Sequence, residues 1–402
     1  MIAPIPRDTP DRSLRFALFA YGFRPFFWAA GAFAVVAGIA WLVIYATGAS
    51  PFRNQLPQLW HAHEMIYGFI VAAIAGFLLT AVPSWTGSAG FAGRPLAALA
   101  AVWLLGRVAF AAGAVLPLSV VAVCDLAFLP ALAVMVAPPL LRARNRNTAL
   151  LIILAVIWLS DALFLGALLR SDSFAARTAL LVAIDVILLL ITVIGGRIVP
   201  AFTASALQAR GNKAKLRTSR WVERAVIGAM LAVLLTDVFL PAPRIAGAVA
   251  ALAALIQAWR LTGWGTLRTL RDPLVWSLHL AYGWLPLGLA LKAIYLLTGA
   301  NWSAHWLHAL TIGVAASMIL AVMTRAALGH TGRPLVAAKA IAVAYALLSF
   351  AALVRVFGPS VLPEHYKASV IAAGSLWGLA FALFLIVYTP ILMRPRIDSR
   401  SG

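Results

Sequence analysis

The chain has 402 residues, of which 63% are hydrophobic and only 11% are charged, whereas a soluble domain carries about 25% charged residues. This composition excludes an ordinary soluble enzyme and a disordered chain, and the single cysteine excludes an intrachain disulfide. A net charge of +20 would suggest nucleic acid on a soluble protein. Here the basic residues lie in loops between apolar runs, where they set topology and meet anionic lipid headgroups. We therefore predict a polytopic protein that contacts the lipid bilayer and binds no nucleic acid.

The apolar runs predict an all-α bundle of about twelve transmembrane helices, because a helix needs about 20 apolar residues to cross a bilayer. The runs are continuous rather than alternating, which excludes a strand barrel. The seventh and eighth runs are the weakest, because the eighth is short. In chain order the runs cover residues 26–47, 60–82, 95–115, 117–140, 148–169, 177–200, 221–240, 244–260, 273–297, 304–328, 335–357 and 367–392.

An even number of spans places both termini on one side of the membrane. Lysine and arginine concentrate in the loops on that side, for example at Arg142, Arg144 and Arg146. The positive-inside rule then predicts that both termini are cytoplasmic. We expect residues 1–402 to form a single integral membrane domain. A basic loop near 201–220 would divide it into two six-helix halves, about 1–205 and 206–402, if such halves exist.

Histidine is rare, and its position along the spans is the main functional clue. His61 and His63 open the second span, and His305 and His308 open the tenth, so all four lie at similar depth on the side opposite the termini. On a helix, His305 and His308 are about 60° apart and share a face, whereas His61 and His63 are about 200° apart. Imidazole is the commonest protein ligand of haem iron and copper. These four histidines are therefore candidate haem ligands, the alternative being hydrogen bonds to headgroups or backbone.

The second and tenth spans also resemble each other in sequence. His63 is followed five residues later by Gly68, and His308 is followed five residues later by Gly313. Both spans continue into a Gly-Arg-Pro-Leu element, although the intervening lengths differ. The pattern suggests that the two histidine-bearing spans are built alike.

Acidic residues inside spans form a second layer of candidates, because ionisable groups in a membrane are costly and face a partner or a cavity. They could orient ligand histidines or carry protons, or they could form interhelical hydrogen bonds and pair with Arg107 or Lys292. The residues concerned are Glu64, Asp125, Asp161, Asp185 and Asp237.

Arginines beside glycines and helix ends cluster on the side of the termini. Guanidinium groups in such positions can bind anionic groups such as carboxylates, and the alternative is that they anchor the helices at the interface. The candidates are Arg24, Arg197, Arg325 and Arg333.

Five segments together resemble the NnrS family over nearly the whole chain. They cover residues 19–27, 60–65, 76–87, 196–203 and 308–333. The resemblance implies a multi-pass protein of the bacterial inner membrane that contains haem and copper. It also implies a role in nitric oxide metabolism and nitrosative stress, with nitric oxide or iron–nitrosyl species as partners. The motifs define no reaction, so redox turnover stays open, and electrons would have to come from a quinol or another protein.

A weaker analogy is to subunit I of the haem–copper oxidases, which also has haem-ligating histidines on spans two and ten. This chain has no histidine on spans six and seven, where those oxidases hold copper. Copper would therefore need other ligands, and His279, His330 and His365 are the candidates. A secondary transporter of a metal ion or small anion is the main alternative function. A sensing or assembly partner without turnover is a further one.

Overall fold

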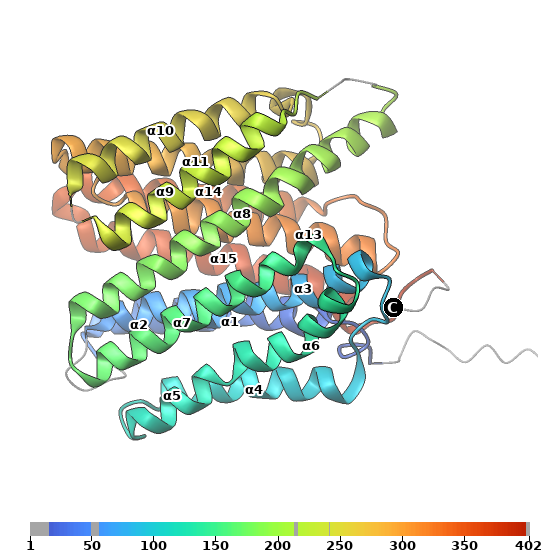
Figure 1. The fold of residues 1–402 in the computed structure, drawn as a ribbon, viewed down its shortest axis with the longest axis horizontal. Helices are drawn as coiled ribbons and strands as arrows, with labels where there is room; N and C mark the ends of the chain where they lie inside the picture. The colour runs from blue at the N-terminus through green and yellow to red at the C-terminus, as the bar shows by residue number, and fades with distance from the viewer. Residues whose placement is uncertain (1–15, 50–55, 213–215, 241, 399–402) are drawn as a thin grey trace, which may run out of the picture.

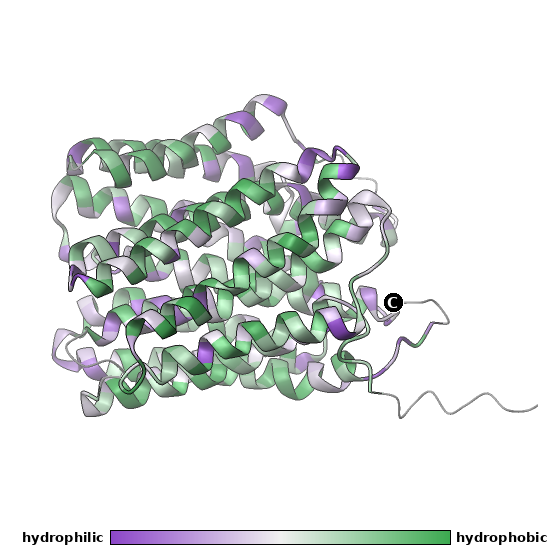
Figure 2. Ribbon diagram, turned by 60° about the horizontal axis from the view of Figure 1, so that its bottom comes forward, coloured by the Kyte–Doolittle hydropathy of each residue, from purple (hydrophilic) through white to green (hydrophobic). Residues whose placement is uncertain are grey.

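The computed structural model describes residues 16–49, 56–212, 216–240 and 242–398. These residues form helices and connecting loops without any strand. The long helices run side by side in one bundle (Figure 1). Apolar residues dominate the middle of the helices, and hydrophilic residues gather near the helix ends (Figure 2). The predicted fold class, a polytopic helical bundle, is confirmed.

Most of the predicted spans correspond to one continuous helix, and four are built from consecutive helical pieces. In chain order the elements are α1 Phe23–Thr47, α2 Pro57–His63, η2 Glu64–Ile70, α3 Val71–Thr86, α4 Gly93–Ala111, α5 Leu118–Leu126, α6 Phe128–Arg142, η3 Arg146–Ala149, α7 Leu150–Leu169, α8 Ser173–Ala209, α9 Arg220–Phe239, α10 Pro243–Thr262, η4 Thr266–Arg268, α11 Pro273–Thr298, η5 Asn301–Ser303, α12 Trp306–His308, η6 Ala309–Ala316, α13 Ser317–His330, α14 Lys339–Val361, η7 Pro363–His365 and α15 Tyr366–Met393.

Eleven helices of the described chain are long and apolar enough to cross a membrane, and α9 is the predicted span that falls outside this set. It has 20 residues, as α10 has, but it carries Glu223, Arg224 and Asp237. Two of these charges are paired within the bundle, since Glu223 bonds to Arg260 and Asp237 bonds to Lys292. The helix therefore forms as predicted, and both of its acidic residues are paired with basic residues of neighbouring helices.

Local sequence explains where several helices begin and end. Gly48 and Gly299 stop α1 and α11 in the left-handed conformation, at φ +74° and +70°, which glycine adopts without steric cost. Asp172 and Asp272 cap the starts of α8 and α11, where their side chains accept hydrogen bonds from backbone N–H groups.

The first and last helices lie together. Helix α1 packs along α15, and the backbone N–H of Ala17 donates to the carbonyl of Met393 at 2.8 Å. Both ends of the described chain therefore lie at one end of the bundle, called here the terminal end. This agrees with an even number of crossings, whereas the cytoplasmic side and the division into two halves stay predictions.

Two helices change to π-helical geometry directly after a histidine, η2 after His63 and η6 after His308. Such insertions are rare and concentrate at functional sites. Each contains one of the two equivalent glycines, Gly68 or Gly313, and an aromatic ring packs directly against each glycine. A Cβ on Gly68 would lie 2.1 Å from the Phe33 ring, and one on Gly313 would lie 2.5 Å from the Trp284 ring. The likeness between the two spans thus extends to their backbone.

Candidate functional site

An apolar cavity of about 490 Å³ lies near the end of the bundle opposite the terminal end. Helix α2 lies at this end of the bundle, on the left in Figure 1, whereas the C-terminus is on the right. Residues of α1, α2, η2, α8, α12, η6, α14 and α15 line it. Most of them are apolar or aromatic, and the polar exceptions include two histidines and two arginines. The histidines, arginines and tryptophans of the lining are His61, His308, Arg177, Arg355, Trp41, Trp306 and Trp377.

The two cavity histidines come from different spans, and each has an unsatisfied nitrogen. The Nδ1 atoms of His61 and His308 are buried and have no hydrogen-bond partner among the described residues, and neither has Nη1 of Arg355. A buried polar atom without a partner costs about 1–3 kcal/mol. The His61 ring is held flat against Trp41, with ring centroids 4.3 Å apart and an interplanar angle of 17°. The cavity therefore presents fixed polar groups that lack protein partners.

His305 lies next to His308 but does not line the cavity. The two rings are 6.4 Å apart, and His305 also contacts the ring of Tyr366 at 5.9 Å. The structure thus groups three of the four expected haem ligands, His61, His305 and His308, at one end of the bundle.

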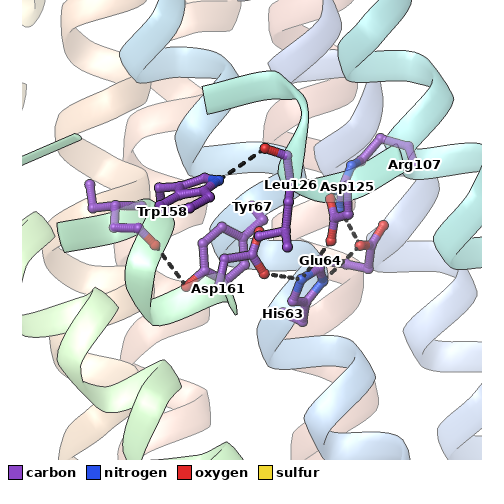
Figure 3. Close-up of polar contacts among 9 residues, drawn as sticks. His63, Glu64, Tyr67, Arg107, Asp125, Leu126, Trp158 and Asp161 are labelled. Atoms are coloured by element: carbon purple, nitrogen blue, oxygen red, sulfur yellow. Dashed lines mark hydrogen bonds and ion pairs between the residues drawn. The ribbon is translucent and has the colours of Figure 1, made fainter. Parts of the chain in front are cut away.

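His63 does not line the cavity, and it lies in a separate polar cluster (Figure 3). Its ring is fully buried and stacks on Phe110, with centroids 3.9 Å apart. Its Nδ1 lies 3.1 Å from Oε1 of Glu64. Its Nε2 lies 3.0 Å from Oδ1 of Asp161 and 3.0 Å from Oδ2 of Asp125. Both ring nitrogens therefore face carboxylates.

Arg107 completes this cluster by bonding to both Glu64 and Asp125. The five side chains, which we call the His63 cluster, come from α2, η2, α4, α5 and α7. Gly106 lets α4 approach α5 closely, because a Cβ there would lie 3.2 Å from the Cα of Asp125. The exposed fraction of each side chain is 6% or less, so the charges must be balanced within the cluster.

A third polar group adjoins the cavity. Lys292 on α11 bonds to Asp237 on α9 and lies 4.9 Å above the ring of Trp306, a cavity residue. Asp185 on α8 is 1% exposed, and its Oδ2 has no partner among the described residues. The pair of Lys292 and Asp237 is structural, and Asp185 adds one buried oxygen without a partner among the described residues.

The three candidate copper ligands occupy separate surroundings. Both nitrogens of His279 contact threonine hydroxyls, at 2.8 Å to Thr203 and 3.0 Å to Thr266. His330, at the end of α13, stacks on Tyr21, and His365 is exposed in η7. Across the described ranges, His63, Asp125 and Asp161 are the one group of three or more such residues whose ligand atoms converge. The structure therefore does not bring the copper candidates together.

The candidate anion-binding arginines also differ from one another. Arg24 is buried, and its Nη1 donates to the carbonyls of Leu392 and Arg394 at 2.9 and 2.6 Å. Arg197 donates to Oδ1 of Asn147 at 2.6 Å, and the guanidinium of Arg325 lies 4.2 Å above the ring of Phe202. Arg197 and Arg325 therefore contact other side chains, whereas Arg24 also has two buried nitrogens, Nε and Nη2, without a partner among the described residues.

Arg333 lies at the terminal end among other arginines. Burial and the charge of Arg394 lower its pKa. Nearby, hydrogen bonds to Asp398 raise the pKa of Arg396, whose Nη1 donates to the carbonyl of His330 at 2.9 Å. The C-terminal Asp398 thus supplies a carboxylate in this basic region.

Sequence reasoning missed Arg355 as a site residue. It lies in the predicted span 335–357, and an arginine within an apolar run was the available signal. Asp125, Asp161 and Arg107 were recognised as buried ionisable groups, but their convergence on His63 was not predicted.

Together these features define a polytopic helical membrane protein with two polar centres inside one bundle, an aromatic cavity and a charged cluster. The family model described as NnrS protein matches residues 17–396. The chain therefore belongs to the NnrS family. No curated protein matches the chain closely enough to extend the comparison.

Proposed function

We propose that the chain is a haem-binding protein of the bacterial inner membrane that acts in nitric oxide metabolism, with His61 and His308 as the haem ligands. The observation that carries this proposal is the pair of half-buried imidazoles, from two spans, that line one aromatic cavity and each have a buried nitrogen without a partner. Membership of the NnrS family supports the haem and the link to nitric oxide.

The residues present fit a haem. The cavity volume lies within the range of about 300–1,000 Å³ of small-molecule sites. Trp41, Trp306 and Trp377 offer flat apolar surfaces, and the guanidinium groups of Arg177 and Arg355 suit carboxylates such as the haem propionates. His63 fits less well, because carboxylates already face both of its nitrogens. His305 is the neighbour that could replace His308.

When bound, haem supplies an iron that can bind nitric oxide and exchange one electron. The chain supplies the rest: His61 and His308 orient the group, Trp41 fixes the plane of His61, and Arg355 balances negative charge. The apolar lining keeps water away from the site. An electron donor, a quinol or a protein, would have to reach this end of the bundle.

Copper belongs to the proposal through family membership. His279, His330 and His365 remain the candidate ligands, and their separate surroundings make a copper site of all three together unsuitable. Each would need further donors.

The test is the oxidised and dithionite-reduced absorption spectrum of the detergent-purified full chain, with metal content by mass spectrometry. We expect a Soret band that shifts on reduction, with about one iron per chain. His61→Ala and His308→Ala should each abolish the band. His365→Ala is the matched control, because this histidine is exposed near the same end of the bundle, and it should leave the band unchanged.

Two results would overturn the proposal. One is a full Soret band in the double variant His61→Ala/His308→Ala. The other is a folded wild-type protein that stays colourless after haem reconstitution. The second result would favour the transport alternative, which counterflow of a metal ion or small anion in proteoliposomes would then test.

A further inference from the structure

The His63 cluster contains more negative than positive charge. Glu64, Asp125 and Asp161 contribute three carboxylates, and Arg107 contributes one guanidinium, so the sum is −2 with a neutral imidazole. Protonating His63 as well would leave the cluster at −1. An uncompensated charge in the interior of a membrane bundle is strongly unfavourable. A divalent cation would bring the sum to zero.

Nε2 of His63 faces two carboxylates but can donate a hydrogen bond to only one of them. Nε2 of His63 carries at most one proton, and its hydrogen bond goes to Asp161. Oδ2 of Asp125 lies equally close, at 3.0 Å, yet it has no hydrogen-bond partner. Asp125 is 4% exposed. A buried carboxylate oxygen therefore lies against the imidazole nitrogen without receiving a hydrogen bond.

We propose that His63, Asp125 and Asp161 bind one divalent first-row metal ion that accepts imidazole nitrogen and carboxylate oxygen together, such as Mn²⁺, Fe²⁺ or Zn²⁺. The ligand atoms of the three residues all lie within 4.8 Å of one another. Ligands at right angles and about 2.1 Å from an ion are about 3.0 Å apart. The two contacts of Nε2 have this separation. One imidazole with carboxylates suits such ions better than Cu⁺, which prefers sulfur.

The remaining members of the cluster then hold the ligand side chains in position. Glu64 accepts the Nδ1–H of His63, at 3.1 Å, which leaves Nε2 free to bind the ion. Arg107 holds Glu64 and Asp125 in place. The rings of Phe110 and Phe164 cover both faces of the imidazole. This site is separate from the haem cavity and does not rest on the proposed function.

The experiment uses Co²⁺ as the probe, because its visible absorption reports its ligands. Full-length protein in detergent is treated with EDTA, dialysed, incubated with Co²⁺ and separated from free ion. We expect the wild type to bind one Co²⁺ per chain. The affinity of Asp161→Asn for Co²⁺ should be lower by about a hundredfold or more. Asp125→Asn should act similarly. Glu64→Gln changes the group that accepts the hydrogen bond of the His63 ligand, and it should weaken Co²⁺ binding by about 10–100-fold.

Asp185→Asn is the matched control, because it neutralises another buried carboxylate outside the cluster, and it should bind Co²⁺ like the wild type. Circular dichroism confirms that each variant is helical. A folded wild-type protein that binds no Co²⁺ would overturn the proposal. Co²⁺ binding by Asp161→Asn and by Asp125→Asn that equals binding by the wild type would also overturn it. His61→Ala separates the two sites, since it should lose the Soret band and keep the Co²⁺.

Discussion

His61 and His63 are two residues apart on one helix, yet they lie in opposite kinds of surroundings. His61 stacks on a tryptophan beside an apolar cavity, whereas His63 is enclosed by carboxylates. The reason is the pitch of the helix, which turns the two side chains about 200° apart. Helix α2 thus has the aromatic cavity on one side and the His63 cluster on the other.

The comparison shows how one short motif can serve two sites. The cavity offers histidines that lack partners, so it is suited to a ligand that arrives from outside the chain. The His63 cluster offers an excess of carboxylate charge, so it is suited to a small cation. Neighbouring histidines of a Trp-His-Ala-His sequence need not share a cofactor.

The largest loss of stability is expected from Arg107→Leu, which disrupts the His63 cluster and leaves the cavity unchanged. The change leaves Glu64 and Asp125 buried without their guanidinium, and breaking a buried ion pair costs about 3–5 kcal/mol. Thermal unfolding in detergent, followed by circular dichroism, should show a large fall in Tm. Arg94→Leu, at an exposed position of α4, is the control and should change Tm little. An unchanged Tm for Arg107→Leu would mean that the carboxylates carry protons.

A smaller loss of stability is expected from Gly68→Ala, which sharpens the comparison between the two π-helical segments. The new Cβ would meet the ring of Phe33, and overpacking typically costs about 1–3 kcal/mol. Gly313→Ala should behave alike, because of Trp284.

Gly228→Ala on α9 is the control for both glycine changes, since nothing lies within 4 Å of the added Cβ. It should be neutral or slightly stabilising. If Gly68→Ala is as stable as Gly228→Ala in the same thermal unfolding experiment, the tight packing of the π-helical segment does not matter for stability.

The smallest effect is expected from Arg355→Gln, which tests the cavity side alone. Losing a guanidinium that balances a ligand carboxylate should weaken haem binding about tenfold, or about 1.4 kcal/mol. Haem titration of the stripped protein measures this. Lys367→Gln changes an exposed basic residue near the same end of the bundle and should leave the affinity unchanged. Tighter binding by Arg355→Gln would contradict the role given to this arginine.

Much of the fold could be predicted from sequence, because a bilayer demands long apolar runs. The twelve predicted runs match helices of the structure, and α9 shows the limit of this reasoning. Its charges lower its apolar character, and their partners Arg260 and Lys292 lie on other helices. Pairing between helices is not visible in a linear pattern.

The candidate sites were predictable only in part. Depth along the spans grouped His61, His63, His305 and His308 without choosing among them, and helical pitch indicated that His61 and His63 would diverge. Which of the two faces the cavity depends on how α2 packs against its neighbours. The convergence of Asp125 and Asp161 on His63 depends on α5 and α7 meeting α2, which no local pattern encodes.

The contact between α1 and α15 has a consequence for the biogenesis of the protein. The buried guanidinium of Arg24, near the start of α1, donates to carbonyls of Leu392 and Arg394 at the far end of the sequence. Because Arg24 precedes Leu392 by 368 residues, its guanidinium has no such acceptors until α15 has been synthesised. Helix α1 therefore gains these two hydrogen bonds only after α15 has been inserted beside it.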